Sequence, residues 1–278
     1  MSYGPKPWQQ LHWDARAAAN FMLGGTGAGL LVAWAVSAAV TPAWRAFVFV
    51  GLACIGLGLG AVWLEIGRKL RAVNVFFHPQ TSWMTREAMV AVVLFGIGLA
   101  ALVFDARALG FAAAFVALGF VYCQGRILHA SKGIPAWREP TVTAFIVTTG
   151  LAEGAGAFLA GAALAGGSHR AGLAFFALAV VARAIAWSRY RARLAHGASR
   201  RALDILDPSG RMLIQLGTIA PLVLAVAGLA FSDVAAIAGV IAGLLALATG
   251  WYLKFVLVTR AAYNQGFALP QLPTRGSR

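Results

Sequence analysis

The segment from Trp44 to Glu65 reads WRAFVFVGLACIGLGLGAVWLE and carries no charged side chain between Arg45 and Glu65. A helix needs about 20 residues to cross the roughly 30 Å hydrocarbon core of a bilayer, and this run is long and apolar enough to do so. Its apolar residues are continuous rather than alternating, which predicts a helix and argues against a strand of a β-barrel. The segment therefore predicts a helical integral membrane protein.

The composition of the whole chain leads to the same fold class. The 278 residues are 60% hydrophobic and 12% charged, with a mean hydropathy of +0.76, which is too apolar for a soluble protein. Similar apolar runs recur along the sequence, and all but two of the connections between them are short. We expect one all-α transmembrane domain over residues 1–278, an eight-helix bundle with spans near 17–39, 44–65, 88–105, 108–128, 141–165, 170–189, 212–231 and 234–258.

Basic residues are distributed unequally over the connections between these spans. The N-terminus, the 2–3, 4–5 and 6–7 connections and the C-terminal tail carry 19 Lys and Arg residues, whereas the other side carries only Arg45, Arg107 and Arg170. The positive-inside rule then predicts that both termini are cytoplasmic, in a bacterial cytoplasmic (inner) membrane. No cleavable signal is expected, because the first apolar run is itself of spanning length.

The net charge of +14 fits either attraction to anionic lipid or an acidic partner docked on the same face. Nucleic acid is not an expected partner, because the basic residues are spread over five segments rather than gathered on one soluble module. The 6–7 connection is particularly basic and is expected to face a partner or lipid. It carries Arg189, Arg191, Arg193, Arg200 and Arg201.

Several cofactors are not expected in this chain. Cys54 and Cys123 lie in separate apolar spans without clustered spacing, so no iron–sulfur cluster or structural zinc, and no other metal site, is predicted. A bis-histidine haem is also disfavoured, because only His129 lies at a helix end. The other histidines, His12, His78, His169 and His196, fall in surface segments.

Glycines spaced four apart indicate close helix packing. The run GGTGAG at 24–29 resembles a phosphate-binding loop only superficially, because it lies within an apolar span. Small residues at such spacing let transmembrane helices approach each other. The same interpretation applies to Gly56 and Gly60, Gly150 and Gly154, and Gly239 and Gly243.

Two ionisable side chains lie deep within the predicted spans, Glu153 in the fifth and Arg183 in the sixth. Inserting such a group into a membrane costs at least about 2.5 kcal/mol, so it usually faces the bundle interior. One interpretation is that these residues pair with each other or with backbone carbonyls. The other is that they form a proton path or a polar cavity.

The connector from Glu65 to Glu87 reads EIGRKLRAVNVFFHPQTSWMTRE and is unusually polar for a segment between two spans. If the second helix continues past Glu65, Arg68, Arg71 and Asn74 share one face with it, because they recur every three residues. Capping of the third helix could explain Ser82, Thr85 and Glu87. Capping does not explain why Glu65, Arg71, His78, Arg86 and Glu87 converge beside Trp63 and Trp83.

A quinone head group requires what this connector offers. It needs donors for two carbonyl oxygens, an apolar or aromatic wall, and a carboxylate or imidazole that exchanges protons with water. The sequence therefore predicts a quinone site at the connector. Its candidate residues are Arg71, Asn74, His78, Ser82, Trp83, Arg86 and Glu87, with Glu65 and Glu87 as the catalytic carboxylates.

At these residues the chain resembles the eight-helix, cofactor-free membrane-anchor subunits of molybdopterin oxidoreductases of the dimethyl sulfoxide reductase and polysulfide reductase type. The matching stretches are EIGRKLRAVN at 65–74, SWMTRE at 82–87 and PAW at 135–137. The opening PWQQ at 7–10 and the closing YNQGF at 263–267 are similar to the branch that serves phenylacetyl-CoA:acceptor oxidoreductases. The eight spans extend the resemblance over almost the whole chain.

The resemblance implies a site for quinone, either ubiquinone or menaquinone, in which Arg71 and Glu87 bind or protonate it. It also implies two partners, a ferredoxin-like iron–sulfur subunit and a catalytic subunit with molybdopterin and molybdenum or tungsten. The chain departs from the family at Glu65, where dimethyl sulfoxide reductase anchors carry histidine. Proton transfer would then involve two carboxylates.

Topology favours a cytoplasmic position for these partners, because electrons must arrive close to the connector. The substrate of the complex would then be intracellular, for example a CoA thioester such as phenylacetyl-CoA, or sulfite. Two rival functions stay open. One is a secondary transporter with a cavity lined by Glu153 and Arg183, and the other is a purely structural anchor without a pocket between the second and third helices.

Overall fold

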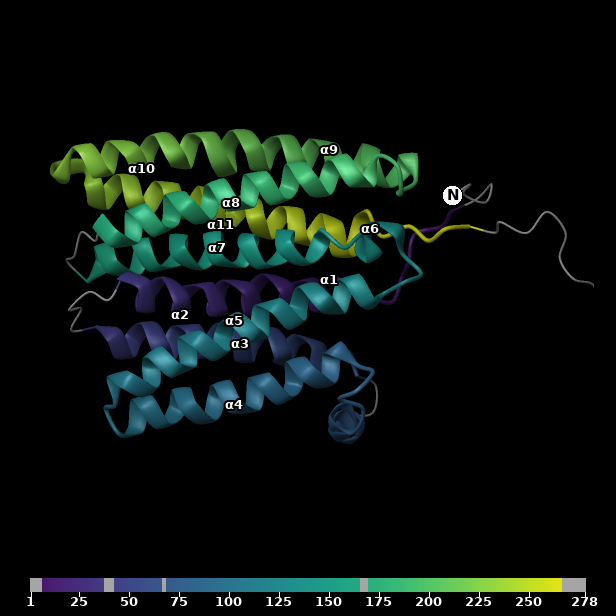
Figure 1. Cartoon of the computed structure of the whole chain (residues 1–278), viewed down its shortest axis with the longest axis horizontal. Helices are drawn as coiled ribbons and strands as arrows, with labels where there is room; N and C mark the ends of the chain where they lie inside the picture. Colours follow the sequence, from purple (N-terminus) through teal and green to yellow (C-terminus); the bar gives the residue numbers. More distant parts are fainter. Residues whose placement is uncertain (1–6, 38–42, 67–68, 166–169, 267–278) are drawn as a thin grey trace, which may run out of the picture.

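The structure is a computed structural model that describes residues 7–37, 43–66, 69–165 and 170–266. Within these ranges it is all-helical, and eight helices or runs of consecutive helical turns are long and apolar enough to cross a membrane. The spans run nearly antiparallel in an elongated bundle (Figure 1). The predicted fold class of an eight-span helical membrane protein is thus confirmed.

The first four spans form one half of the bundle. The first is α1 (Ala15–Ala19), a π-helical turn η1 (Asn20–Gly24) and α2 (Gly25–Ser37). It is followed by α3 (Trp44–Glu65), α4 (Trp83–Val103) and α5 (Arg107–Ala130). The third span begins at Trp83, earlier than the sequence predicted, because Ser82 caps it by accepting a hydrogen bond from the Thr85 amide at 3.3 Å.

The last four spans form the other half. They are α7 (Val142–Leu164), α8 (Arg170–Leu194), the run of α9 (Arg200–Ile214), η3 (Gln215–Ile219) and α10 (Ala220–Ala230), and finally η4 (Ser232–Val234), α11 (Ala235–Phe255) and η5 (Val256–Arg260). The seventh span begins at Arg200 rather than near 212, since Ser199 caps α9 and Pro208 is accommodated within the helix. Helix α7 is central and contacts α2, α5, α8 and α11.

Glycine allows α7 to pack closely against α2 of the other half and against α11 of its own half. A methyl group on Gly154 would collide with the backbone of Gly29 and Leu30, and one on Gly156 would collide with the Gly243 backbone. The predicted small-residue packing is therefore confirmed for α2, α7 and α11. It is wrong for Gly56 and Gly60, which face only a Phe95 ring and open space, respectively.

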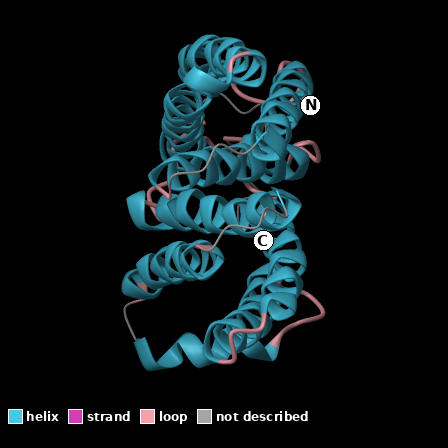
Figure 2. Cartoon of the chain, turned by 90° about the vertical axis from the view of Figure 1, so that its left-hand side faces the viewer, coloured by secondary structure: helices cyan, strands magenta, loops and turns pink. Residues whose placement is uncertain are grey.

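One end of the bundle gathers most of the polar connections, and we call it the connector end. It carries α6 (Pro135–Arg138) and the 3-10 helix η2 (Lys69–Phe77). Helix η2 lies across the spans, seen end-on in Figure 1 and along its length in Figure 2. The second helix does not continue past Glu65, which was the condition for a shared face with Arg71 and Asn74, because Ile66 adopts an extended conformation with ψ 113° and ends α3.

The segments before the first span and after the last also meet at the connector end. The Trp8 amide donates to Asn264 Oδ1 at 3.0 Å, and the Asn264 amide donates to the Trp8 carbonyl at 3.0 Å. Trp137 of α6 stacks on Trp13 and donates through Nε1 to the Leu257 carbonyl at 2.9 Å. The PWQQ, PAW and YNQG motifs therefore lie together, while Phe267 lies outside the described residues.

Candidate functional site

A cavity of about 430 Å³ lies at the connector end between the first, second and third spans and η2. Its wall is mostly apolar and includes the side chains of Trp13 and Trp63. Both predicted catalytic carboxylates, Glu65 and Glu87, line it. The remaining lining residues are Ala17, Asn20, Phe21, Leu59, Val62, Ile66, Ala72, Val75, Met84, Ala88 and Ile127.

Glu87 is the most deeply placed polar group of this cavity. It is 5% exposed and lies beyond the capping turn of α4, so capping accounts for Ser82 but not for Glu87. The Asn20 side chain donates to Glu87 Oε1 at 3.3 Å, and the Gln124 amide donates to the Asn20 backbone carbonyl at 2.8 Å. A buried carboxyl held by an amide on an apolar wall can bind a polar ligand atom and exchange a proton with it.

Glu65 occupies a different position in the cavity. It is the last residue of α3 and is only partly buried, so it lies where the cavity meets the connector. The two carboxylates therefore differ in solvent exposure: Glu65 lies nearer to solvent, and Glu87 lies inside the cavity. This arrangement suits the passage of protons between water and a bound ligand.

Most of the other predicted site residues do not line the cavity. Arg71 and Asn74 lie exposed on η2, and His78 lies exposed after it. The physical reason is the break at Ile66, which turns η2 across the bundle and presents Ala72 and Val75 to the cavity instead. Arg68 lies outside the described residues.

Arg86 and Trp83 belong to a separate cluster that holds the turn before α4. Arg86 donates to the carbonyls of Pro79 and Gln80 at 2.8 and 2.9 Å. Its guanidinium lies 4.2 Å from the Trp83 ring centroid, and that of Arg126 lies 4.4 Å from the same ring. Cation–π contacts of this kind stabilise local structure, and Trp83 here makes two of them.

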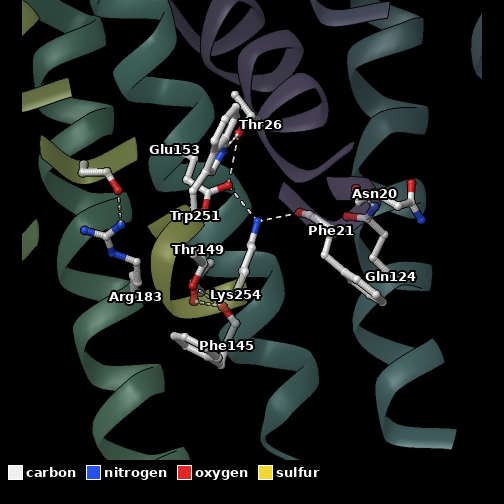
Figure 3. Close-up of polar contacts among 12 residues, drawn as sticks. Asn20, Phe21, Thr26, Gln124, Phe145, Thr149, Glu153, Arg183, Trp251 and Lys254 are labelled. Atoms are coloured by element: carbon white, nitrogen blue, oxygen red, sulfur yellow. Dashed lines mark hydrogen bonds and ion pairs between the residues drawn. The ribbon is translucent and has the colours of Figure 1, made fainter. Parts of the chain in front are cut away.

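The centre of the bundle holds a buried ion pair that sequence reasoning missed. Lys254 Nζ lies 2.7 Å from Glu153 Oε2, and both side chains are fully buried (Figure 3). Lys254 also donates to the Phe21 carbonyl at 2.8 Å. Lys254 was assigned to the basic residues of the C-terminal tail, but it lies near the end of α11 inside the bundle. A lysine within an apolar run was the signal that could have revealed it.

Arg183 does not pair directly with Glu153. Its Nη1 donates to the Ala246 carbonyl at 2.8 Å, and its Nη2 donates to the Gly217 carbonyl of η3. The interpretation that Arg183 is held by backbone carbonyls is therefore confirmed, and direct pairing with Glu153 is wrong. Glu153 instead receives hydrogen bonds from Lys254 and from the Thr26 hydroxyl, the latter at 3.2 Å.

Both buried cations bind backbone carbonyls of π-helical turns. Such turns often mark functional positions. In η1, the carbonyl of Phe21 accepts from Lys254 and that of Asn20 accepts from Gln124 at 2.8 Å. In η3, the carbonyl of Gly217 accepts from Arg183. The backbone thus solvates both buried cations.

A second cavity, of about 300 Å³, lies between α8 and α9. Trp187, Arg191, Asp207 and Arg211 are among its lining residues, and Arg191 pairs with Asp207 through two contacts of 2.5 and 2.8 Å. Part of the basic 6–7 connection is thus neutralised within the chain.

Comparison with known proteins provides no assignment. No protein-family model matches the sequence, and a search of curated proteins finds no similar sequence.

Proposed function

We propose that this chain is the quinone-reactive membrane-anchor subunit of a multi-subunit molybdenum or tungsten iron–sulfur oxidoreductase. The observation that carries the proposal is the apolar cavity at the connector end with Glu87 inside it and Glu65 at its connector side. Its volume of about 430 Å³ is within the range of about 300 to 1,000 Å³ that is usual for small-molecule sites.

The chemistry of quinone reduction fits these two carboxylates. Reduction of a quinone to a quinol consumes two electrons and two protons and forms two O–H bonds. Glu87, which lies beside the apolar wall, supplies a proton to a quinone oxygen, and Glu65 replaces it from the water side. Asn20 orients Glu87 by donating to Oε1. The electrons come from an iron–sulfur partner, since no redox group is proposed in this chain.

The distribution of basic residues supports a position for the iron–sulfur partner at the connector end. Helix η2 and α6, which carry Arg71 and Arg138, lie at the same end as the cavity. Arg45, Arg107 and Arg170 lie at the opposite ends of their spans. By the positive-inside rule the connector end is cytoplasmic in a bacterial inner membrane, so the iron–sulfur and molybdopterin subunits dock there. An intracellular substrate such as phenylacetyl-CoA or sulfite follows from this orientation.

Purification of a tagged copy in mild detergent tests the assembly. The expected result is co-purification of iron, molybdenum or tungsten with a ferredoxin-like subunit, identified by metal analysis and mass spectrometry. The same membranes should reduce quinone, and Glu87→Gln should lower that rate while Arg71→Gln, outside the cavity, changes it less. A metal-free, solitary protein that binds no quinone would contradict the proposal.

A transporter is the second candidate. The buried Glu153–Lys254 pair and Arg183 favour it, because charged groups within spans often mark ion paths. However, neither of the two cavities described above includes these three residues. The cavity between the second and third spans also weighs against a purely structural anchor.

A further inference from the structure

The buried polar groups form two clusters that approach each other at Gly25. The first cluster extends inward from the cavity through Glu87, Asn20 and Gln124. The second is the Glu153–Lys254 pair with Thr26 and Trp251, whose Nε1 donates to the Thr26 hydroxyl at 2.8 Å. The first cluster comes from α4, η1 and α5 and the second from α2, α7 and α11. In Figure 3, Asn20 and Gln124 lie on the right of the Lys254 ammonium, and Glu153 lies on its left.

Glycine at position 25 lets the Lys254 ammonium approach the first span closely. A methyl group on Gly25 would collide with Lys254 Nζ at 2.5 Å and would lie 3.7 Å from Gln124 Oε1. The ammonium of the second cluster and the amide oxygen of the first therefore lie beside the same glycine.

Several polar atoms of the two clusters lack hydrogen-bond partners within the described chain. They include Gln124 Oε1 and Asn20 Oδ1, both buried acceptors, and Glu153 Oε1 beyond them. Lys254 has three N–H donors and uses two, on Glu153 and on the Phe21 carbonyl. Buried polar atoms without protein partners are commonly satisfied by ordered water, which typically makes about three hydrogen bonds.

We propose that ordered water at the unpaired side-chain oxygens of Asn20 and Gln124 links Glu87 to Lys254 and joins the two clusters into one proton-exchange path. The path leads from Glu87 at the cavity to Glu153 at the bundle centre. Glu153 and Lys254 are then a buried proton-binding site that communicates with solvent through the cavity. This inference does not depend on what the cavity binds.

The proton transfer along this path conserves atoms and charge and requires no redox partner. Lys254 gives one proton to the Glu153 carboxylate, and the carboxyl of Glu87 returns one proton to Lys254 through the water. One O–H bond is lost at Glu87 and one is formed at Glu153, while Lys254 stays an ammonium. Arg183 is the other charged group at the bundle centre, and it is occupied by the carbonyls of Ala246 and Gly217. Thr149 and Thr249 donate to carbonyls of their own helices.

Hydrogen exchange at the Lys254 ammonium tests the path directly. The sequence has only four lysines, Lys6, Lys69, Lys132 and Lys254, so 15N-lysine labelling gives few NMR signals, and Lys254→Arg assigns the buried one. We expect its hydrogens to exchange with D₂O in the purified chain without quinone. Gln124→Leu should slow this exchange at least about tenfold, the effect of a barrier raised by a lost hydrogen bond.

Two further variants distinguish an effect on the proposed path from a general destabilisation of the bundle. Thr143→Val removes another side-chain hydrogen bond between α7 and α5, to the Gly125 carbonyl at 3.3 Å, and should leave the exchange rate unchanged. Glu87→Gln keeps the shape of the cavity and should also slow the exchange of the Lys254 hydrogens. It is an independent test of the path if Gln124→Leu does not fold. Exchange that is equally fast in wild type, Gln124→Leu and Glu87→Gln would overturn the proposal, and so would an ammonium that never exchanges. Neither result would affect quinone binding.

Discussion

Lys254 and Glu153 are 101 residues apart in the chain, yet their side chains form a 2.7 Å ion pair that is fully buried in the bundle. Removing two charges from water costs several kcal/mol per ion, and this cost is offset only when the pair is well hydrogen-bonded. Here the Phe21 carbonyl and the Thr26 hydroxyl provide the additional hydrogen bonds. The pair therefore makes the stability of the bundle depend on both partners.

Lys254→Met should destabilise the protein strongly, by about 3 to 5 kcal/mol, because Glu153 would be left as an uncompensated buried charge. The double variant Glu153→Gln with Lys254→Met should recover part of this loss. Thermal unfolding of the detergent-purified variants measures both effects. As a control, Arg45→Gln removes an exposed 3.6 Å pair with Asp105 and should cost less than about 1 kcal/mol. A double variant no more stable than Lys254→Met would show that the pair is not the cause.

Gly154→Ala should lower the unfolding temperature, because the added methyl collides with the backbone of Gly29 and Leu30, which cannot move aside as a side chain can. Gly60→Ala is the matched control, since nothing lies within 4 Å of its added methyl. Alanine in a helix interior is favoured over glycine by about 0.5 to 1 kcal/mol, so Gly60→Ala should be neutral or stabilising. Equal effects of the two substitutions would contradict the packing argument.

Ala88→Phe should block the cavity, because Ala88 lines it from α4. Binding of a short-chain quinone, followed by quenching of tryptophan fluorescence, should weaken at least about tenfold, which corresponds to about 1.4 kcal/mol. Val92→Phe places the same ring one turn further along α4 on a residue that is 60% exposed, and should leave binding unchanged. If Ala88→Phe binds quinone as wild type does, the quinone lies elsewhere.

Helix η2 should lie in the membrane interface. Its side chains Leu70, Val73 and Phe77 are 94%, 60% and 65% exposed, and an amphipathic helix at the end of a bundle buries such residues among lipid head groups. An environment-sensitive fluorophore on Leu70→Cys or Phe77→Cys, with Cys54 and Cys123 replaced, should report an apolar environment in lipid vesicles. A label on Asp14→Cys, in the polar segment before the first span, provides the aqueous reference. Emission at Leu70 equal to this reference would place η2 outside the lipid.

Part of the candidate site could be predicted from the sequence. Glu65 and Glu87 flank the polar connector, and both line the cavity. Arg71 and His78 could not be placed, because a break of one residue at Ile66 redirected the whole segment after it. A local pattern specifies which residues are polar but not the direction in which a short helix leaves its neighbour.

The polar groups that surround Glu87 were missed for a related reason. Asn20 and Gln124 lie in apolar spans that were interpreted only as membrane segments. Asn20 bonds Glu87 from another span, and Gln124 bonds the Asn20 carbonyl from a third. Helical spacing indicates which residues share a face of one helix. It does not indicate which other helix that face will meet.

The sequence by itself determined the eight spans and their shared helical character. In a hydrocarbon environment each backbone group must bond within its own segment, so length and hydropathy are sufficient to predict a span. Only the tertiary structure decided that Lys254 meets Glu153 rather than solvent and that carbonyls of η1 and η3 receive the two buried cations. These partners come from different helices, and packing of glycine-rich faces brings them together.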